Sequence, residues 1–211
     1  CMGSGALFSV CWGQRDLARL RRQTHAAFVL IAVCTVVLNA AAFLLLDAMK
    51  TLLSVPAEVW PLMRSYLFVI FFGIGGTFLY NYYASLLRAV GNSLVPLLFL
   101  AAAAVLNIAL DLVFVLVCRW GVEGAAAATV LAQWLSGIGT AVYTLVRCPE
   151  LRARREERRI TGSMLRELLS ASVLTCLQQS VMNLGILMVQ GRINSFGPVI
   201  MAEFADAVKL D

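Results

Sequence analysis

The sequence predicts an all-α, polytopic membrane helix bundle, and two observations carry this prediction. Of the 211 residues, 61% are hydrophobic and only 14% are charged, whereas a soluble domain is about 45–50% apolar and about 25% charged. The hydrophobic residues also gather in uncharged blocks, each long enough for the roughly 20 helical residues that cross a bilayer core. Five blocks are predicted as full spans, at 26–46, 65–87, 89–110, 124–146 and 168–191, and partial spans flank them at 2–12 and from 196 onward.

The blocks favour helices over the strands of a membrane barrel. Barrel strands alternate apolar and polar residues over about 10 positions, and these blocks are longer and show no period of two. A helix also pairs its own backbone groups, which the water-free bilayer core requires.

The connections between the blocks carry turn signals and charge. An Arg-rich stretch, 13–22, follows the first partial span. Pro61 suits the first turn of the helix that contains the span 65–87, because N–H groups in a first turn have no partner within the helix. Pro96 opens the next helix along the chain. A short turn around Arg119 separates the third and fourth full spans, and a longer polar segment, 147–167, holds seven Arg and four Glu before the fifth.

The distribution of basic residues predicts the orientation. Alternate connections carry twelve Lys and Arg on one side and four on the other. Positively charged loops stay in the cytoplasm, so 13–22, the turn at Arg88 and 147–167 are predicted to be cytoplasmic. The last of these is the best domain boundary. Residues 1–146 and 168–211 are therefore expected to belong to different units, and the partial spans suggest that the chain is a fragment of a longer protein.

Several other classes of protein fit poorly. The net charge of +5 sits beside the predicted spans, without the interleaved aromatic residues that stack on bases, so no nucleic-acid partner is expected. The six cysteines are scattered without a CxxC or Cys/His cluster, which argues against a zinc site or a disulfide framework. Paired catalytic carboxylates and GxSxG or HExxH motifs are missing, so the sequence does not suggest an enzyme.

Asp111 is the one carboxylate deep inside a long apolar run, because the block 89–110 continues after it to Cys118. A charge at the bilayer centre costs roughly 2.5–3.5 kcal/mol, so the residue is expected to face a cavity or a partner, unless it lies near the outer headgroups. Asn107 precedes it by four residues and shares its helix face. Thr129, on the next helix, is a third candidate ligand for a hard cation such as Na⁺. The same groups would also suit a proton-binding carboxylate or a contact that holds two helices together.

Other polar side chains within the spans are candidates for the wall of a substrate cavity. Tyr80 and Asn81 lie in the second full span, and Gln133 shares a helix face with Thr129. Gln179 and Asn183 form part of one stripe on the fifth span. A wet cavity wall and hydrogen bonding between helices explain that stripe equally well. For Tyr80 and Asn81 the alternative is an aromatic belt at the membrane interface.

Ordered segments across nearly the whole chain resemble the multidrug and toxic-compound extrusion (MATE) transporters, especially the bacterial DNA-damage-inducible subgroup. The segments are Trp-Gly-Gln-Arg-Asp at 12–16, Leu-Tyr-Asn at 79–81, Leu-Arg-Ala-Val-Gly-Asn-Ser at 87–93 with Pro96, Leu-Asn-Ile-Ala-Leu-Asp at 106–111 and Gly-Val-Glu-Gly-Ala-Ala at 121–126, extended by Ala-Thr at 128–129 and Ile-Asn-Ser-Phe-Gly at 193–197.

The resemblance implies twelve helices in two six-helix lobes. Residues 1–146 would hold the second to sixth helices, 147–167 would be the cytoplasmic linker, and 168–211 would open the second lobe. The resemblance also implies a cation site in the first lobe, in which an Asp of the first helix acts together with Asn107, Asp111 and Thr129. The seventh helix of some relatives carries a coupling carboxylate, and 168–191 has none.

These expectations describe a monomeric, multi-pass protein of the bacterial inner membrane. It would need no cofactor, and it would export amphipathic or cationic compounds in exchange for Na⁺ or H⁺. A lipid-linked saccharide flippase of the same wider superfamily is the alternative, which predicts a basic, water-filled cavity.

Overall fold

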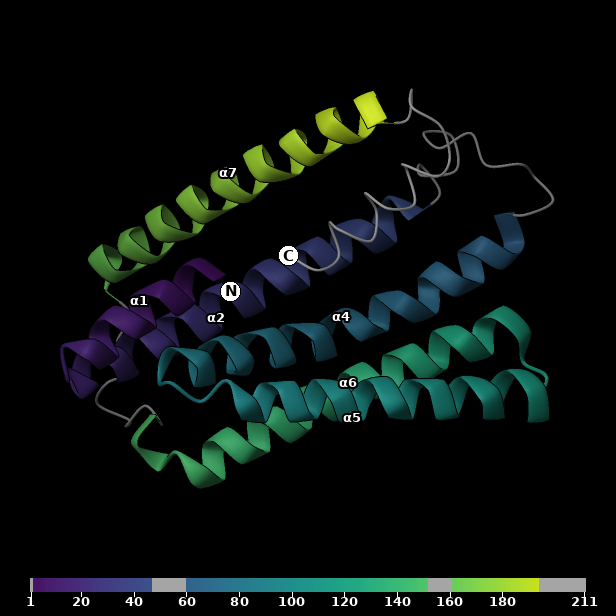
Figure 1. Ribbon diagram of the computed structural model, residues 1–211, viewed down its shortest axis with the longest axis horizontal. Helices are drawn as coiled ribbons and strands as arrows, with labels where there is room; N and C mark the ends of the chain where they lie inside the picture. Colours follow the sequence, from purple (N-terminus) through teal and green to yellow (C-terminus); the bar gives the residue numbers. More distant parts are fainter. Residues whose placement is uncertain (1, 47–59, 152–160, 194–211) are drawn as a thin grey trace.

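The computed structural model describes residues 2–46, 60–151 and 161–193, and this part of the chain is a bundle of long helices (Figure 1). The predicted partial span from 196 onward lies outside the described residues. The helices are α1 (Met2–Gly13), α2 (Leu17–Leu44), α4 (Trp60–Ala89), α5 (Leu94–Asp111), a π-helix (Leu112–Val117), α6 (Gly121–Arg147), a 3₁₀ turn (Pro149–Leu151) and α7 (Gly162–Ile193).

Four of the predicted spans are confirmed as helices long and apolar enough to cross a membrane. They are Leu17–Leu44, Trp60–Ala89, Leu94–Val117 and Gly121–Arg147. The fifth predicted span, 168–191, lies within the continuous helix α7, which is not one of the four found among the described residues.

Two helices begin earlier than the hydrophobic pattern predicts. Helix α2 starts at Leu17, inside the stretch predicted as a connection, because the side chain of Asp16 accepts a hydrogen bond from the backbone N–H of Arg19 (2.9 Å). Such an N-cap satisfies a backbone donor that the first helical turn leaves free. Helix α7 likewise starts at Gly162, so the end of the predicted linker is helical and Glu167 belongs to this helix.

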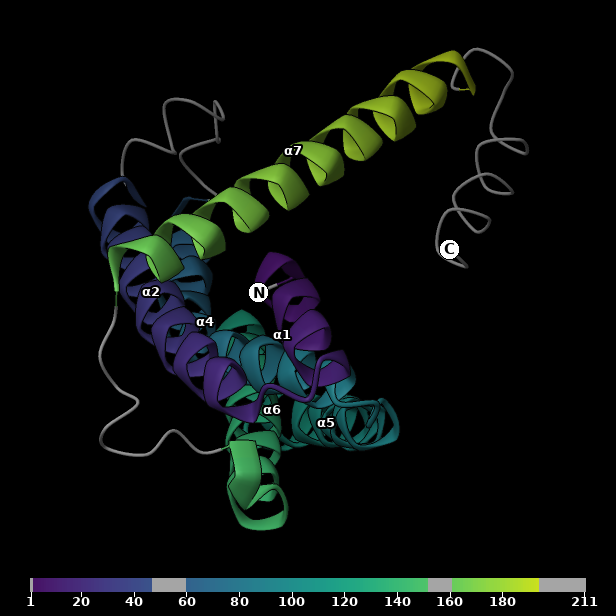
Figure 2. The same cartoon turned by 90° about the vertical axis from the view of Figure 1, so that its left-hand side faces the viewer.

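The main hydrophobic cluster lies at the end of the bundle where the predicted cytoplasmic connections meet. It joins residues from α1, α2, α4, the 3₁₀ turn and α7, namely Phe8, Cys11, Leu20, Ala26, Ala27, Tyr82, Leu86, Leu151 and Leu168. This end is on the left in Figure 1 and faces the viewer in Figure 2. The helix ends that the charge pattern assigns to one side therefore lie together.

Helices α4, α5 and α6 form a second packed group, in which α4 and α6 make the most extensive contact in the described chain. Helix α5 contacts α6 along its length, as the short connection between them predicts. Many large apolar side chains of these helices are exposed on the outer faces, the pattern expected of helices surrounded by hydrocarbon.

Candidate functional site

A polar contact joins the C-terminal part of α5 to the N-terminal part of α6. The side-chain nitrogen of Asn107 donates a hydrogen bond to the hydroxyl oxygen of Thr129 over 3.4 Å. Thr129 itself donates to the carbonyl oxygen of Ala125 on its own helix (3.0 Å). Two of the three residues predicted to bind a cation are thus brought together from separate helices.

Asp111, the third predicted ligand, is the last residue of α5, one helical turn beyond Asn107. Its Oδ1 is buried and has no hydrogen-bond partner within the described chain. A buried polar atom without a partner normally costs about 1–3 kcal/mol, and more when it is charged. This carboxylate is therefore set up to gain a partner, such as a proton, a cation or a donor from another segment.

The chain changes its helical pitch directly after Asp111. Residues Leu112–Val117 form a π-helix, in which the backbone N–H of Cys118 bonds to the carbonyl of Val113, five residues back (2.9 Å). Segments of π-helix are rare and occur frequently at functional sites. No sequence signal marks this feature, because apolar residues continue through it without any turn residue.

A cavity of about 290 Å³ lies between α4, α5 and α6 beside the Asn107–Thr129 contact. Besides Asn107 and Thr129, other polar residues of α4 and α6 form its wall. The lining residues are Thr77, Tyr80, Leu100, Ala103, Ala104, Asn107, Thr129, Ala132, Gln133 and Ser136.

Two of the residues predicted for a cavity wall line this space. The hydroxyl of Tyr80 donates to the carbonyl of Pro96 (3.1 Å), which fixes its ring between α4 and α5. The side chain of Gln133 occupies the space where Gly73 of α4 lacks a Cβ. Gln133 can approach α4 this closely because glycine has no side chain to exclude it.

The other predicted wall residues lie elsewhere. Asn81 donates to the carbonyl of Thr77 on its own helix (2.9 Å) and does not line the cavity. Gln179 and Asn183 are exposed on α7. In the described chain α7 packs against α1 and α2, and no comparable packing joins it to α5 or α6. The described chain therefore does not unite the α7 stripe with the cavity.

Two polar lining residues, Thr77 and Ser136, were not predicted from the sequence. Ser136 continues the spacing of Thr129 and Gln133 at intervals of four and three residues, which places all three on one helix face. That stripe was a usable signal. Thr77 precedes Tyr80 by three residues on α4, so it too shares a helix face with a predicted residue.

The cavity and the Asn107–Thr129 contact lie in a chain with clear relatives. Residues 1–113 match the family model described as MatE.

Two proteins of Bacillus subtilis (strain 168) are similar over most of the chain. The probable multidrug resistance protein YpnP is 30% identical over 205 residues, which are 94% of this chain and 44% of YpnP. The probable multidrug resistance protein YoeA is 25% identical over 202 residues, 92% of this chain and 44% of YoeA. The chain thus spans less than half the length of both relatives.

Solved structures share the fold. The Vibrio cholerae MATE transporter VcmN in its bent form superposes with a TM-score of 0.84 at 21% identity, covering 99% of this chain and 47% of VcmN. An inward-facing multidrug resistance MATE family transporter of the MOP superfamily gives a TM-score of 0.76 at 20% identity, over 82% of this chain and 39% of that one. Since the MatE model covers more than half of the 211 residues, the chain belongs to the MatE family.

Proposed function

We propose that this chain is part of a secondary transporter that exports amphipathic or cationic compounds in exchange for Na⁺ or H⁺. The proposal rests on one observation above all. Asp111 has a buried carboxylate oxygen without a partner in the described chain, and it lies one helical turn beyond Asn107, whose amide contacts the hydroxyl of Thr129 across α5 and α6.

The membrane setting is firm. The chain is part of a multi-pass membrane protein of the bacterial inner membrane, and its described residues include four helices long and apolar enough to span a membrane. Its curated relatives are named as probable multidrug resistance proteins, which supports a transporter rather than an enzyme.

The donor set suits a small, hard cation or a proton. Carboxylate, amide and hydroxyl oxygens are the ligands that such cations prefer in proteins. A buried carboxylate that is charged and unpaired is costly, and binding either a proton or a cation removes that cost. Occupation of this group by the ion in one state and its release in the other would couple the ion gradient to the change of access.

The neighbouring cavity supports an amphipathic substrate. Its polar groups are neutral amides and hydroxyls, and its remaining lining is apolar. No Arg or Lys lines it, so this part of the described chain lacks the basic wall that a saccharide-phosphate flippase would need. Partners are therefore expected to be small amphipathic molecules and the lipid bilayer, with the full-length protein acting as a monomer.

The test is gradient-driven export of ethidium, a fluorescent cationic amphipath, by the natural protein that contains this chain. Asp111→Asn removes the charge while nearly preserving the side chain's shape, and export is expected to fall to the level of cells without the protein. Glu150→Gln is the matched control, because it makes the same carboxylate-to-amide change at an exposed position in the 3₁₀ turn. Undiminished export by Asp111→Asn would reject this role for the carboxylate.

A further inference from the structure

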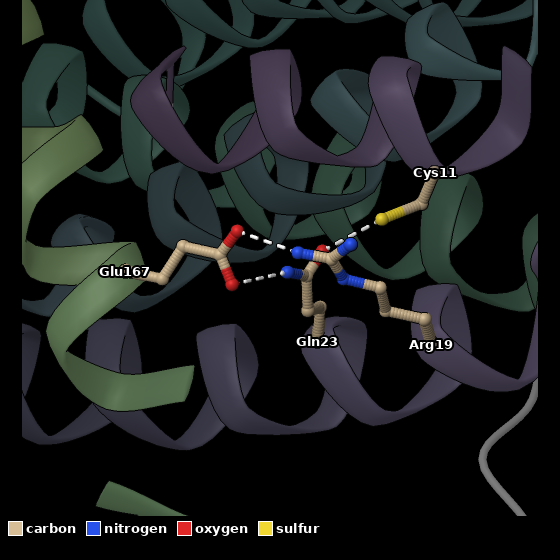
Figure 3. A network of polar contacts seen from close by, with 4 residues as sticks. All are labelled: Cys11, Arg19, Gln23 and Glu167. Carbon is tan, nitrogen blue, oxygen red and sulfur yellow. Dashed lines mark hydrogen bonds and ion pairs between the residues drawn. The ribbon is translucent and has the colours of Figure 1, made fainter. Parts of the chain in front are cut away.

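Three polar side chains meet at the end of the bundle opposite Asp111 and connect α7 to α2 (Figure 3). Glu167 of α7 accepts a charge-assisted hydrogen bond from the guanidinium of Arg19 at 2.7 Å through its Oε1. Its Oε2 accepts a second hydrogen bond from the side-chain nitrogen of Gln23 at 3.1 Å. Both carboxylate oxygens of Glu167 are thus bound to one helix, 144 or more positions away in the sequence.

Gln23 extends the network to a third helix. Its side chain is fully buried, and its Oε1 accepts a hydrogen bond from the thiol of Cys11 on α1 over 3.0 Å. The amide of Gln23 is therefore engaged on both sides, by α1 and by α7. If Glu167 moves away, this buried nitrogen loses its partner, and a buried polar group without a partner is costly.

The backbones of α1 and α7 also touch beside this network. A Cβ added to Gly3 would lie 2.7 Å from Cα of Ser172 and 2.8 Å from the carbonyl oxygen of Ala171. Leu168, one residue after Glu167, is buried in the hydrophobic cluster of the same end. Further along α7, every described side chain from 176 to 185 is exposed.

Helix α7 is thus held by α1 and α2 at its first turns, and it diverges from them beyond, as Figure 2 shows. The polar contacts join Arg19 and Gln23 of α2, before the predicted linker 147–167, to Glu167, which is the last residue of that linker and belongs to α7. Helix α7 opens the second predicted lobe. The contact therefore lies between the two predicted lobes, at the end predicted to face the cytoplasm.

We infer that Glu167 is a positioning residue for transport, which holds the two lobes together on the cytoplasmic side through Arg19 and Gln23. The inference rests on the proposed transport function, because alternating access requires the lobes to separate at this end in one of the two states. The Glu167 contacts exist in the state closed to the cytoplasm and break in the state open to it. Loss of these contacts shifts the resting protein toward the open state.

The balance of exposure suits a contact that must open repeatedly. The side chains of Arg19 and Glu167 are 42% and 38% exposed, and ion pairs in such positions contribute little net stability because water solvates the separated charges well. Gln23 supplies the buried part of the contact and makes its geometry specific. A fully buried ion pair would resist opening far more strongly.

The native thiol of Cys11 reports on this opening, because it is buried beneath the contact. The natural protein, with its other cysteines replaced by serine, is labelled in inside-out vesicles by a membrane-impermeant maleimide, without any substrate. Glu167→Ala leaves the buried nitrogen of Gln23 without its partner, and the loss of such a hydrogen bond changes a two-state equilibrium by about tenfold or more, so labelling of Cys11 is expected to accelerate by that factor. The rates are compared on the high-pH plateau of each variant, where the thiol is fully ionised, so that the direct effect of the removed charge on the thiol drops out. Glu150→Ala, at the same end but outside the network, is expected to leave the rate unchanged.

A second protein that keeps only Cys148 separates opening from unfolding. Cys148 lines a cavity between α2, α4 and the end of α6 to which α7 contributes no residue, so opening between the lobes leaves its labelling rate unchanged, whereas unfolding raises the rates of both thiols. Arg19→Ala is expected to accelerate labelling of Cys11 in the presence of Glu167 and to add little in the Glu167→Ala protein, since the two residues act through one contact.

An unchanged Cys11 rate in Glu167→Ala, equal acceleration of both thiols, or additive effects of Arg19→Ala and Glu167→Ala would each overturn the inference. The labelling needs no substrate and no gradient. A protein that fails to export ethidium but shows the expected labelling would reject the proposed substrate while leaving the contact between the lobes in place.

Discussion

Gly76 of α4 and Gly137 of α6 pack main chain against main chain. A Cβ on Gly137 would lie 2.5 Å from the carbonyl oxygen of Gly76, and a Cβ on Gly76 would lie 2.7 Å from the backbone nitrogen of Trp134. The indole N–H of Trp134 then reaches the carbonyl of Phe72 on α4 (2.9 Å). In a bilayer, where lipid is as apolar as the helix surface, such close packing and interhelical hydrogen bonds supply much of the association.

Gly76→Ala is expected to destabilise the protein. The added methyl group meets rigid backbone rather than a movable side chain, and overpacking of this kind costs about 1–3 kcal/mol. The measurement is denaturation of the purified protein in detergent micelles, followed by the helical circular dichroism signal. Gly185→Ala is the matched control, since no atom lies within 4 Å of the added Cβ. Equal stability of the two variants would contradict the packing described here.

Tyr82→Phe is expected to lower stability by a smaller amount. The buried hydroxyl of Tyr82 donates to the carbonyl oxygen of Thr24 over 2.7 Å and so joins α4 to α2. A hydrogen bond of this kind contributes about 0.5–1.5 kcal/mol, and its loss is measured by the same denaturation. Tyr83→Phe is the control, because the neighbouring Tyr83 makes no comparable bond within the described residues. A larger loss in Tyr83→Phe than in Tyr82→Phe would count against this assignment.

The sequence predicted the features that depend on local composition. Long apolar blocks set where the spans lie, and the short turn around Arg119 predicted that the helices carrying Asn107 and Thr129 are neighbours, which the hydrogen bond between these residues confirms. The basic residues also predicted which helix ends lie together, since charged connections cannot lie within the bilayer.

The remaining features depend on contacts between distant segments, which no local pattern encodes. The Arg-rich stretch appeared to be a connection because charge marks a loop, yet Asp16 caps it as the start of α2. The bond from Gln23 to Glu167 depends on how α7 folds back over α2. The position of Gln133 depends on the missing side chain of Gly73, on another helix.

The thiol of Cys148 is expected to react slowly with N-ethylmaleimide at neutral pH. Burial raises the pKa of Cys148, and the nearby negative charge of Glu150 raises it further. Because the thiolate is the reactive form, a raised pKa lowers the reactive fraction at any pH below it. Glu150→Gln removes only the second cause, so the midpoint of the rate's pH profile is expected to move to lower pH. The two proteins should react equally fast above both pKa values, and coincident profiles at all pH values would show that Glu150 has no influence.

Thr129→Val and Thr129→Ser are expected to separate the role of the hydroxyl from that of the side chain's shape. Valine matches the shape of threonine but removes the oxygen that accepts from Asn107, whereas serine keeps that oxygen. If the hydroxyl binds the coupling ion, Thr129→Val raises the Na⁺ concentration, or lowers the pH, needed for half-maximal ethidium export, and Thr129→Ser stays close to the parent protein. The loss of one neutral ligand hydrogen bond corresponds to about 0.5–1.5 kcal/mol, or roughly a two- to tenfold change in that concentration.

If instead Thr129 only joins α5 to α6, the valine variant loses stability in denaturation while its ion dependence stays the same. The two readouts therefore distinguish an ion ligand from a contact between helices.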